Sequence, residues 1–175
     1  MSRLFLILLL IAAPLLAQTP RSQPEPSPQP ATRDNWVYQQ GALRNRAHQI
    51  LKSELSRRLD HACDPLKLSN AAFGNCFAAD EAITERNYRA FVQALKASLA
   101  IEPPDVSSER LPLPSKNFAA GEAAWHTYVD KTCAALGDTV YGASGAATDI
   151  TMCQQNLTRQ HMKDLSEVFL DNIQL

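Results

Sequence analysis

The chain has 175 residues, of which 45% are hydrophobic, and its formal net charge at neutral pH is −1. This length suits one domain of ordinary size. A charge so close to zero lacks the basic footprint of a protein that binds nucleic acid or an anionic membrane surface. We therefore expect neither to be its partner.

The first 17 residues have the pattern of a secretory signal peptide. Arg3 supplies a positive charge, residues 4–13 are almost wholly apolar, and Ala17 is the small residue that signal peptidase needs. The apolar run is shorter than the roughly 18 residues of a membrane span, which argues against an uncleaved anchor. No cysteine directly follows the apolar run to accept a lipid. We expect cleavage after Ala17 and a periplasmic or secreted protein without a membrane anchor.

Residues 18–34 are rich in Pro, Gln and Ser and contain few apolar residues. Such a segment buries too little surface to offset the entropy lost on ordering, so we predict a disordered linker. Residues 35–175 then form the folded domain.

The first half of that domain shows two helical stripes. In the first, apolar residues recur at spacings of three and four, and the predicted helix ends near His61, before the Asp64-Pro65 break. Its apolar residues are Leu43, Ala47, Ile50, Leu51, Leu55 and Leu59. A second helix can begin at Ser69 or Asn70, both good N-cap types, and Pro103 stops it. Its stripe is Phe73, Phe77, Ile83, Tyr88, Phe91, Leu95 and Leu99.

Two further helices follow a proline-rich crossover at 102–114. The third begins within 115–117 and stops at Gly137, a natural C-terminal residue; its stripe is Phe118, Trp125, Tyr128, Val129, Cys133 and Leu136. Thr148 can cap the fourth, whose stripe is Ile150, Cys153, Leu157, His161, Leu165 and Phe169. No segment alternates with period two. The sequence predicts a small all-α domain, a bundle of about four antiparallel helices.

Four cysteines follow the signal peptide, and an even number in an exported chain indicates two disulfides. No two are two to four residues apart, as zinc ligands usually are, so we predict no metal site. Short loops close most easily, which favours Cys63–Cys76 and Cys133–Cys153. Antiparallel helices would bring all four cysteines to one end of the bundle, where crossed pairings are also feasible.

The usual catalytic patterns are absent: no Gly-x-Ser-x-Gly elbow, no phosphate-binding loop and no His-Glu-x-x-His. The best triad that can be assembled uses His126, Asp130 and Ser144, but His/Asp pairs four apart are common on helix surfaces. We therefore predict a protein that is not an enzyme and needs no cofactor.

The segment from Gly137 to Ala147 is the candidate binding loop. Its glycines permit turns that other residues resist, and it is longer than a simple helix connection requires. The candidate partner-binding residues are Asp138, Tyr141, Gly142, Ser144 and Gly145. A plain connector is the alternative interpretation.

Other residues are candidates for supporting this loop. We expect Trp125 and Tyr128 to pack in the core, since they share helical spacing with Val129. Asn87 and Arg159 are polar residues on otherwise apolar turns. We expect them to hydrogen-bond loop carbonyls or a carboxylate such as Asp130, fixing the base of the loop.

These residues resemble the LprI-type lysozyme-inhibitor domain family of exported bacterial proteins. The resemblance covers about 63–165 and is carried by Cys63, Asn75-Cys76, Asn87-Tyr88, Trp125, Tyr128, Asp130, Cys133, Gly142-Ala143-Ser144, Cys153, Leu157-Thr158 and Arg159. The chain departs from the family at Val129, where arginine is usual, and at Ala143, where glycine is usual. The resemblance implies a lysozyme (muramidase) inhibitor acting by loop insertion or steric block, with Thr158 among the supporting residues. An envelope interaction module for another protein is the alternative.

Overall fold

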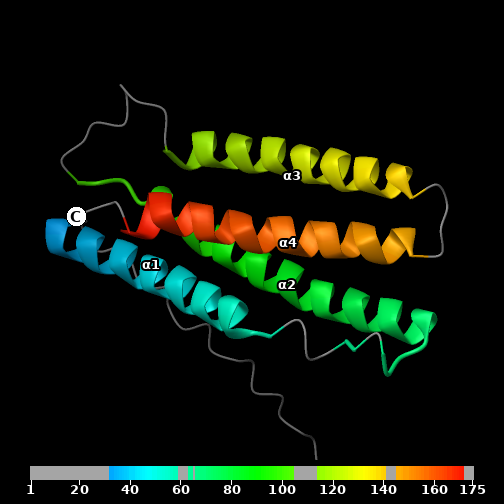
Figure 1. Ribbon diagram of the computed structural model, residues 1–175. Coiled ribbons are helices and arrows are strands. Elements are labelled where there is room, and N and C mark those ends of the chain that lie inside the picture. Colours follow the sequence, from blue (N-terminus) through cyan, green and yellow to red (C-terminus); the bar gives the residue numbers. More distant parts are fainter. Residues whose placement is uncertain (1–31, 59–62, 65, 105–113, 141–144, 172–175) are drawn as a thin grey trace, which may run out of the picture. The chain divides into compact units, whose positions relative to one another are not determined.

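The computed structural model describes residues 32–58, 63–64, 66–104, 114–140 and 145–171. In these residues the chain forms only helices, as predicted: α1 (Arg33–Ser56), α2 (Asn70–Leu99), α3 (Pro114–Thr139), α4 (Ala146–Ser166) and the π-helical turn η1 (Glu167–Asp171) (Figure 1). The predicted signal peptide, 1–17, lies outside the described residues, as does most of the predicted linker, 18–34. Because α1 begins at Arg33, the last two linker residues belong to the helix.

Local capping chemistry sets the start of the first two helices. The hydroxyl of Thr32 accepts a hydrogen bond from the backbone N–H of Asn35 at 3.3 Å. Ser69 does the same for Ala72 at 3.3 Å, so α2 begins at Asn70 as predicted. Each cap satisfies a first-turn N–H that has no partner within its helix.

Three predicted helix ends are wrong. The last residue of α1 is Ser56, earlier than the predicted end near His61, which itself lies outside the described residues. The α3 helix continues through Gly137 to Thr139. The α4 helix begins at Ala146 after an N-cap at Gly145, which makes no side-chain capping bond, rather than after Thr148. The physical reason at the α3–α4 junction is packing between the two helices, described below.

Consecutive helices run antiparallel, as predicted, but α2 and α4 run parallel and pack directly on each other. Gln155 of α4 donates to Asp80 of α2 at 2.7 Å, and further along both helices the rings of Tyr88 and His161 lie 6.2 Å apart, which fixes this direction. The α1 helix packs mainly on α2, and α3 packs mainly on α4 (Figure 1).

The core lies where these four helices meet. Its buried members are Ala47, Leu51, Tyr88, Phe91, Ala94, Leu95, Phe118, Met162 and Leu165. About half of the predicted stripe residues belong to this core or pack against it. Tyr128 and Leu136 are among those that do not, since 55% and 41% of their surfaces are exposed. The prediction that Tyr128 packs in the core is therefore wrong, because more than half of its surface is open to solvent.

Candidate functional site

Both disulfides lie at one end of the helices, which we call the disulfide end. The structure contains the expected pairs: Cys63–Cys76, with a Cα–Cα distance of 5.7 Å, and Cys133–Cys153, with 5.6 Å. The second bond joins the last turns of α3 to the first turns of α4. The start of α2 lies there too, since a Cβ added at Gly74 would lie 3.3 Å from the Thr148 hydroxyl. The predicted gathering of four cysteines is confirmed.

Close packing extends α3 beyond its predicted stop. A Cβ added at Gly137 would lie 2.6 Å from Cδ1 and 2.9 Å from Cγ1 of Ile150. Glycine at this position therefore lets α3 and α4 approach each other closely, and it lies within the helix rather than ending it. The Cys133–Cys153 bond closes the same junction one turn away.

The segment between these helices is shorter than the predicted loop, 137–147. It runs from Val140 to Gly145, and we call it the α3–α4 connector. Asp138 lies on the last turn of α3 and is exposed, and Gly145 is exposed at the N-cap of α4. The other predicted binding residues, Tyr141, Gly142 and Ser144, lie outside the described residues.

Asn87 and Arg159 contact a carboxylate, but it is Glu54 of α1 rather than the predicted Asp130. The Asn87 side-chain amide donates to Glu54 Oε2 at 2.7 Å. An Arg159 nitrogen lies 3.6 Å from Glu54 Oε1. Arg159 also donates to carbonyls, those of Leu55 and Arg57 at 3.4 and 3.3 Å. These belong to the end of α1, so the two residues fix α1 rather than the base of the connector.

Glu54 is the centre of a buried polar network that joins α1, α2 and α4. We call this the Glu54 network; its members are Glu54, Arg57, Asp80, Thr84, Asn87, Gln155 and Arg159. Glu54 is fully buried, and Arg57 Nε lies 3.0 Å from its Oε2. Arg57 also donates to Asp80 Oδ1 at 2.9 Å. Two carboxylates thus face two guanidinium groups, which offsets the cost of burying each charge.

Thr84 completes the network through its hydroxyl. It donates to Glu54 Oε1 at 2.8 Å and accepts from Arg57 Nη2 at 2.7 Å. Gln155 reaches the same hydroxyl from α4 at 3.3 Å. The sequence carried one signal for this site: Glu54 falls three residues after Leu51 and seven after Ala47, on the apolar stripe of α1.

The remaining predicted support residues separate into buried and exposed ones. Thr158 is buried on α4. Trp125 is half-buried, and its ring stacks on His161 with centroids 4.1 Å apart and planes 8° from parallel. Asp130 is exposed on α3. Its neighbour in the rejected triad, His126, is exposed on the same helix and touches Trp125 and Tyr88 with ring edges.

A second buried cluster, which sequence reasoning missed, ties α3 to the central helices. We call it the Glu122 cluster: Tyr88 of α2, Glu122 of α3 and His161 of α4. The Tyr88 hydroxyl donates to Glu122 Oε2, and His161 Nε2 lies 2.9 Å from Glu122 Oε1. Burial raises the pKa of the Glu122 carboxyl, but the hydrogen bonds from His161 and Tyr88, together with the charges of His161 and His126, outweigh it and leave that pKa below its usual value. Burial and the nearby carboxylate raise the pKa of Tyr88.

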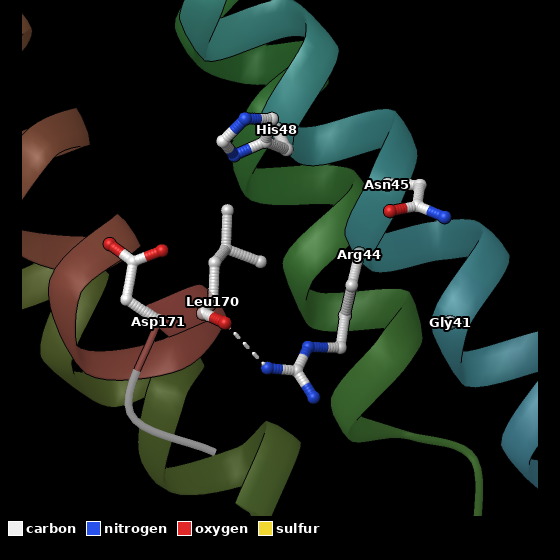
Figure 2. A pocket seen from close by; sticks show the side chains of 6 residues that line it. All are labelled: Gly41, Arg44, Asn45, His48, Leu170 and Asp171. Atoms are coloured by element: carbon white, nitrogen blue, oxygen red, sulfur yellow. Dashed lines mark hydrogen bonds between the residues drawn. The ribbon is translucent and has the colours of Figure 1, made fainter. Parts of the chain in front are cut away.

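A shallow cavity of about 220 Å³ lies away from the disulfide end, between the middle of α1 and η1 (Figure 2). Its lining residues are Gly41, Arg44, Asn45, His48, Leu170 and Asp171. Arg44 spans it by donating to the Leu170 carbonyl at 2.9 Å, and the Leu170 side chain extends toward His48. This hydrogen bond holds the end of η1 against α1.

Three further properties of the described residues bear on metal binding and on the compartment of the protein. Within them, no group of three or more His, Cys, Asp or Glu side chains could hold a metal ion. None of the helices among them is both long and apolar enough to cross a membrane. The two disulfides are typical of an oxidising compartment outside the cytosol.

Comparison with known proteins leaves the chain without an assigned relative. No protein-family model, no curated protein and no solved structure matches it.

Proposed function

We propose that the chain is an exported helical binding protein that inhibits lysozyme-type muramidases in the periplasm or outside the cell. The observation that carries the proposal is the α3–α4 junction, where a disulfide and the Gly137–Ile150 packing hold both ends of the connector. Fixing both ends of a segment reduces the conformational entropy that it can lose on binding, which favours affinity. The signal-like N-terminus and the family resemblance supply the compartment and the target.

The proposed mechanism is steric. The connector enters the substrate cleft of the muramidase, and Tyr141 and Ser144 hydrogen-bond near the catalytic carboxylates. Asp138 is exposed on the last turn of α3, beside the connector, and offers a carboxylate to basic groups at the rim of the cleft. The carboxylates of Glu54 and Glu122 are buried and are bound by side chains of other helices, which suits a role in holding helices rather than in turnover.

The test is a peptidoglycan-clearing assay with several muramidases. Wild-type protein should slow clearing, and Tyr141→Ala/Ser144→Ala should lose about tenfold or more in apparent affinity, as expected when interface contacts worth about 1.4 kcal/mol are lost. Tyr38→Ala is the matched control, because Tyr38 is a 76% exposed tyrosine on the first turns of α1. Equal effects of the two variants would rule out the connector as the binding surface.

An envelope interaction module with a different protein partner is the second candidate. The observation that favours it is the exposure of Tyr128 and Leu136 on α3, outside the connector. Tyrosine is enriched at protein interfaces. If this candidate is right, Tyr128→Ala will lose a partner captured from periplasm, the connector double variant will keep it, and no muramidase will be enriched.

A further inference from the structure

We propose that the Glu122 cluster is an acid-sensitive contact that holds the middle of α3 against α2 and α4, and that protonation of Glu122 releases it. This proposal is independent of the function proposed above. It concerns a conformational change within the fold, and its readouts need no partner.

The two oxygens of the Glu122 carboxylate contact side chains of two different helices. Glu122 Oε2 accepts from Tyr88 of α2, while Glu122 Oε1 faces His161 Nε2 of α4 at 2.9 Å. A single side chain of α3 therefore ties that helix to both helices it packs against. When the carboxyl takes up a proton, it becomes a donor and a poorer acceptor, so both contacts weaken together.

Aromatic rings surround the cluster and limit access of water. Trp125 of α3 stacks on His161 at 4.1 Å, and Tyr88 packs against Trp125 with ring centroids 5.2 Å apart. Burial of this kind makes charge–charge and hydrogen-bond contacts stronger than they are in water. The state of Glu122 should therefore affect the position of the Trp125 ring directly.

Other titratable groups also face the cluster. On α2, Glu85 lies near Tyr88 and is paired with Arg89 at 3.0 Å. On α3 itself, His126 packs its ring edge on Tyr88. On α4, His161 is the facing group. Positive charge on either histidine favours the ionised form of Glu122, and both hydrogen bonds to the carboxylate do the same.

The direction of the pH effect follows from these contacts. The pKa of Glu122 in the folded protein lies below its usual value of 4.5, so its contribution is fully present above about pH 4.5 and is lost as the pH falls through the lowered value. The Cys133–Cys153 bond continues to hold one end of α3, and Phe118 packs on Phe169 near the other. Release should thus be local, confined to the middle of α3.

The experiment follows Trp125 fluorescence from pH 6 downward in a full-length Trp36→Phe background, which leaves one of the two tryptophans. Amide hydrogen exchange, corrected for the intrinsic effect of pH, locates the change. We expect a fluorescence transition below about pH 4.5, with faster exchange in α3 around Glu122 before α1 and α2 lose protection. Glu122→Gln should lack the transition and exchange about tenfold faster in this segment at neutral pH.

Two further variants make the outcome decisive. Glu85→Gln removes a neighbouring carboxylate and should keep the transition. Tyr88→Phe removes one stabilising hydrogen bond, so the midpoint should move up toward 4.5; this variant replaces Glu122→Gln if the latter fails to fold. The proposal is overturned if Glu122→Gln retains the transition, if Tyr88→Phe leaves the midpoint in place, or if all helices lose protection together.

Discussion

At the scale of single residues, the fold depends on a few buried charges whose partners come from other helices. Glu54 is fully buried, with Asn87 and Thr84 of α2 and Arg159 of α4 around it. An exposed ion pair contributes little, whereas removing one member of a buried pair leaves the other charges without compensation. The two kinds of site in this chain should therefore respond very differently to the same substitution.

Glu54→Gln should lower the free energy of unfolding by about 3–5 kcal/mol, because Arg57 and Arg159 lose their shared counter-charge. Urea denaturation monitored by circular dichroism measures this. Glu85→Gln is the control: its partner Arg89 is 73% exposed, so the expected loss is about 0–1 kcal/mol. Similar losses in the two variants would mean that the Glu54 network is not the main polar tie between α1 and the central helices.

Gly137 and Gly121 offer a matched pair within one helix. A Cβ at Gly137 would press on Ile150, whereas nothing lies within 4 Å of a Cβ at Gly121. Gly121→Ala should raise the free energy of unfolding by about 0.5–1 kcal/mol, the usual gain of alanine over glycine in a helix. Gly137→Ala has the same gain but must displace the Ile150 side chain, so it should be less stable than Gly121→Ala by about 1–3 kcal/mol. Equal stabilisation by the two substitutions would show that α3 and α4 are not in close contact at Gly137.

At the scale of elements, local chemistry predicted the start of α2, but it predicted neither the start of α4 nor the end of α3. The start of α2 follows from Ser69 alone, because an N-cap acts within its own first turn. The end of α3 does not follow from Gly137, because whether that glycine ends the helix or lies within it depends on Ile150 of another helix. Packing between helices overrides local stop signals when it buries more surface.

The candidate sites were likewise predictable where the signal is local, and not where it depends on contacts between distant parts of the chain. Cysteine pairing was predictable from spacing and compartment. The role of Arg159 in binding a carboxylate was predictable, but its partner was not, because Glu54 lies 105 residues earlier in the chain. A carboxylate on an apolar stripe, such as Glu54 or Glu122, signals a buried polar contact, but only the tertiary structure identifies the partners.

The Cys133–Cys153 bond closes a sequence separation of 20 residues. Replacing both cysteines with serine should cost about 3 kcal/mol in the free energy of unfolding, chiefly through the freer unfolded chain. Hydrogen exchange should also rise near Gly145 at the start of α4, while α1 stays protected. Unchanged exchange at the junction would contradict the view that this bond holds the connector.

At the scale of the whole molecule, stability should fall at both pH extremes through the Glu122 cluster. On the alkaline side, the pKa of Tyr88 is raised above its usual value of 10.0 by burial and by its bond to Glu122. A raised pKa gives stability that is present below about pH 10 and is lost as the pH rises above it, because only the unfolded chain then releases the proton readily. Melting temperatures from pH 8 to 11 should fall in wild type, with a shallower decline in Tyr88→Phe. Equal slopes would indicate that other groups control alkaline stability.

Different parts of the molecule hold different helices in place. The Glu54 network holds α1 to α2 and α4, the Glu122 cluster holds α3, and the disulfide end holds the α3–α4 connector. The connector is thus presented by helices that are fixed independently of it.

The most direct test of the proposed function is the rate of peptidoglycan clearing by muramidases of several types, measured as purified wild-type protein is added. We predict a saturable fall in rate for at least one type, reaching its limit near one inhibitor per enzyme. Clearing rates that stay unchanged for every type, at concentrations well above that of the enzyme, would contradict the assignment as a muramidase inhibitor.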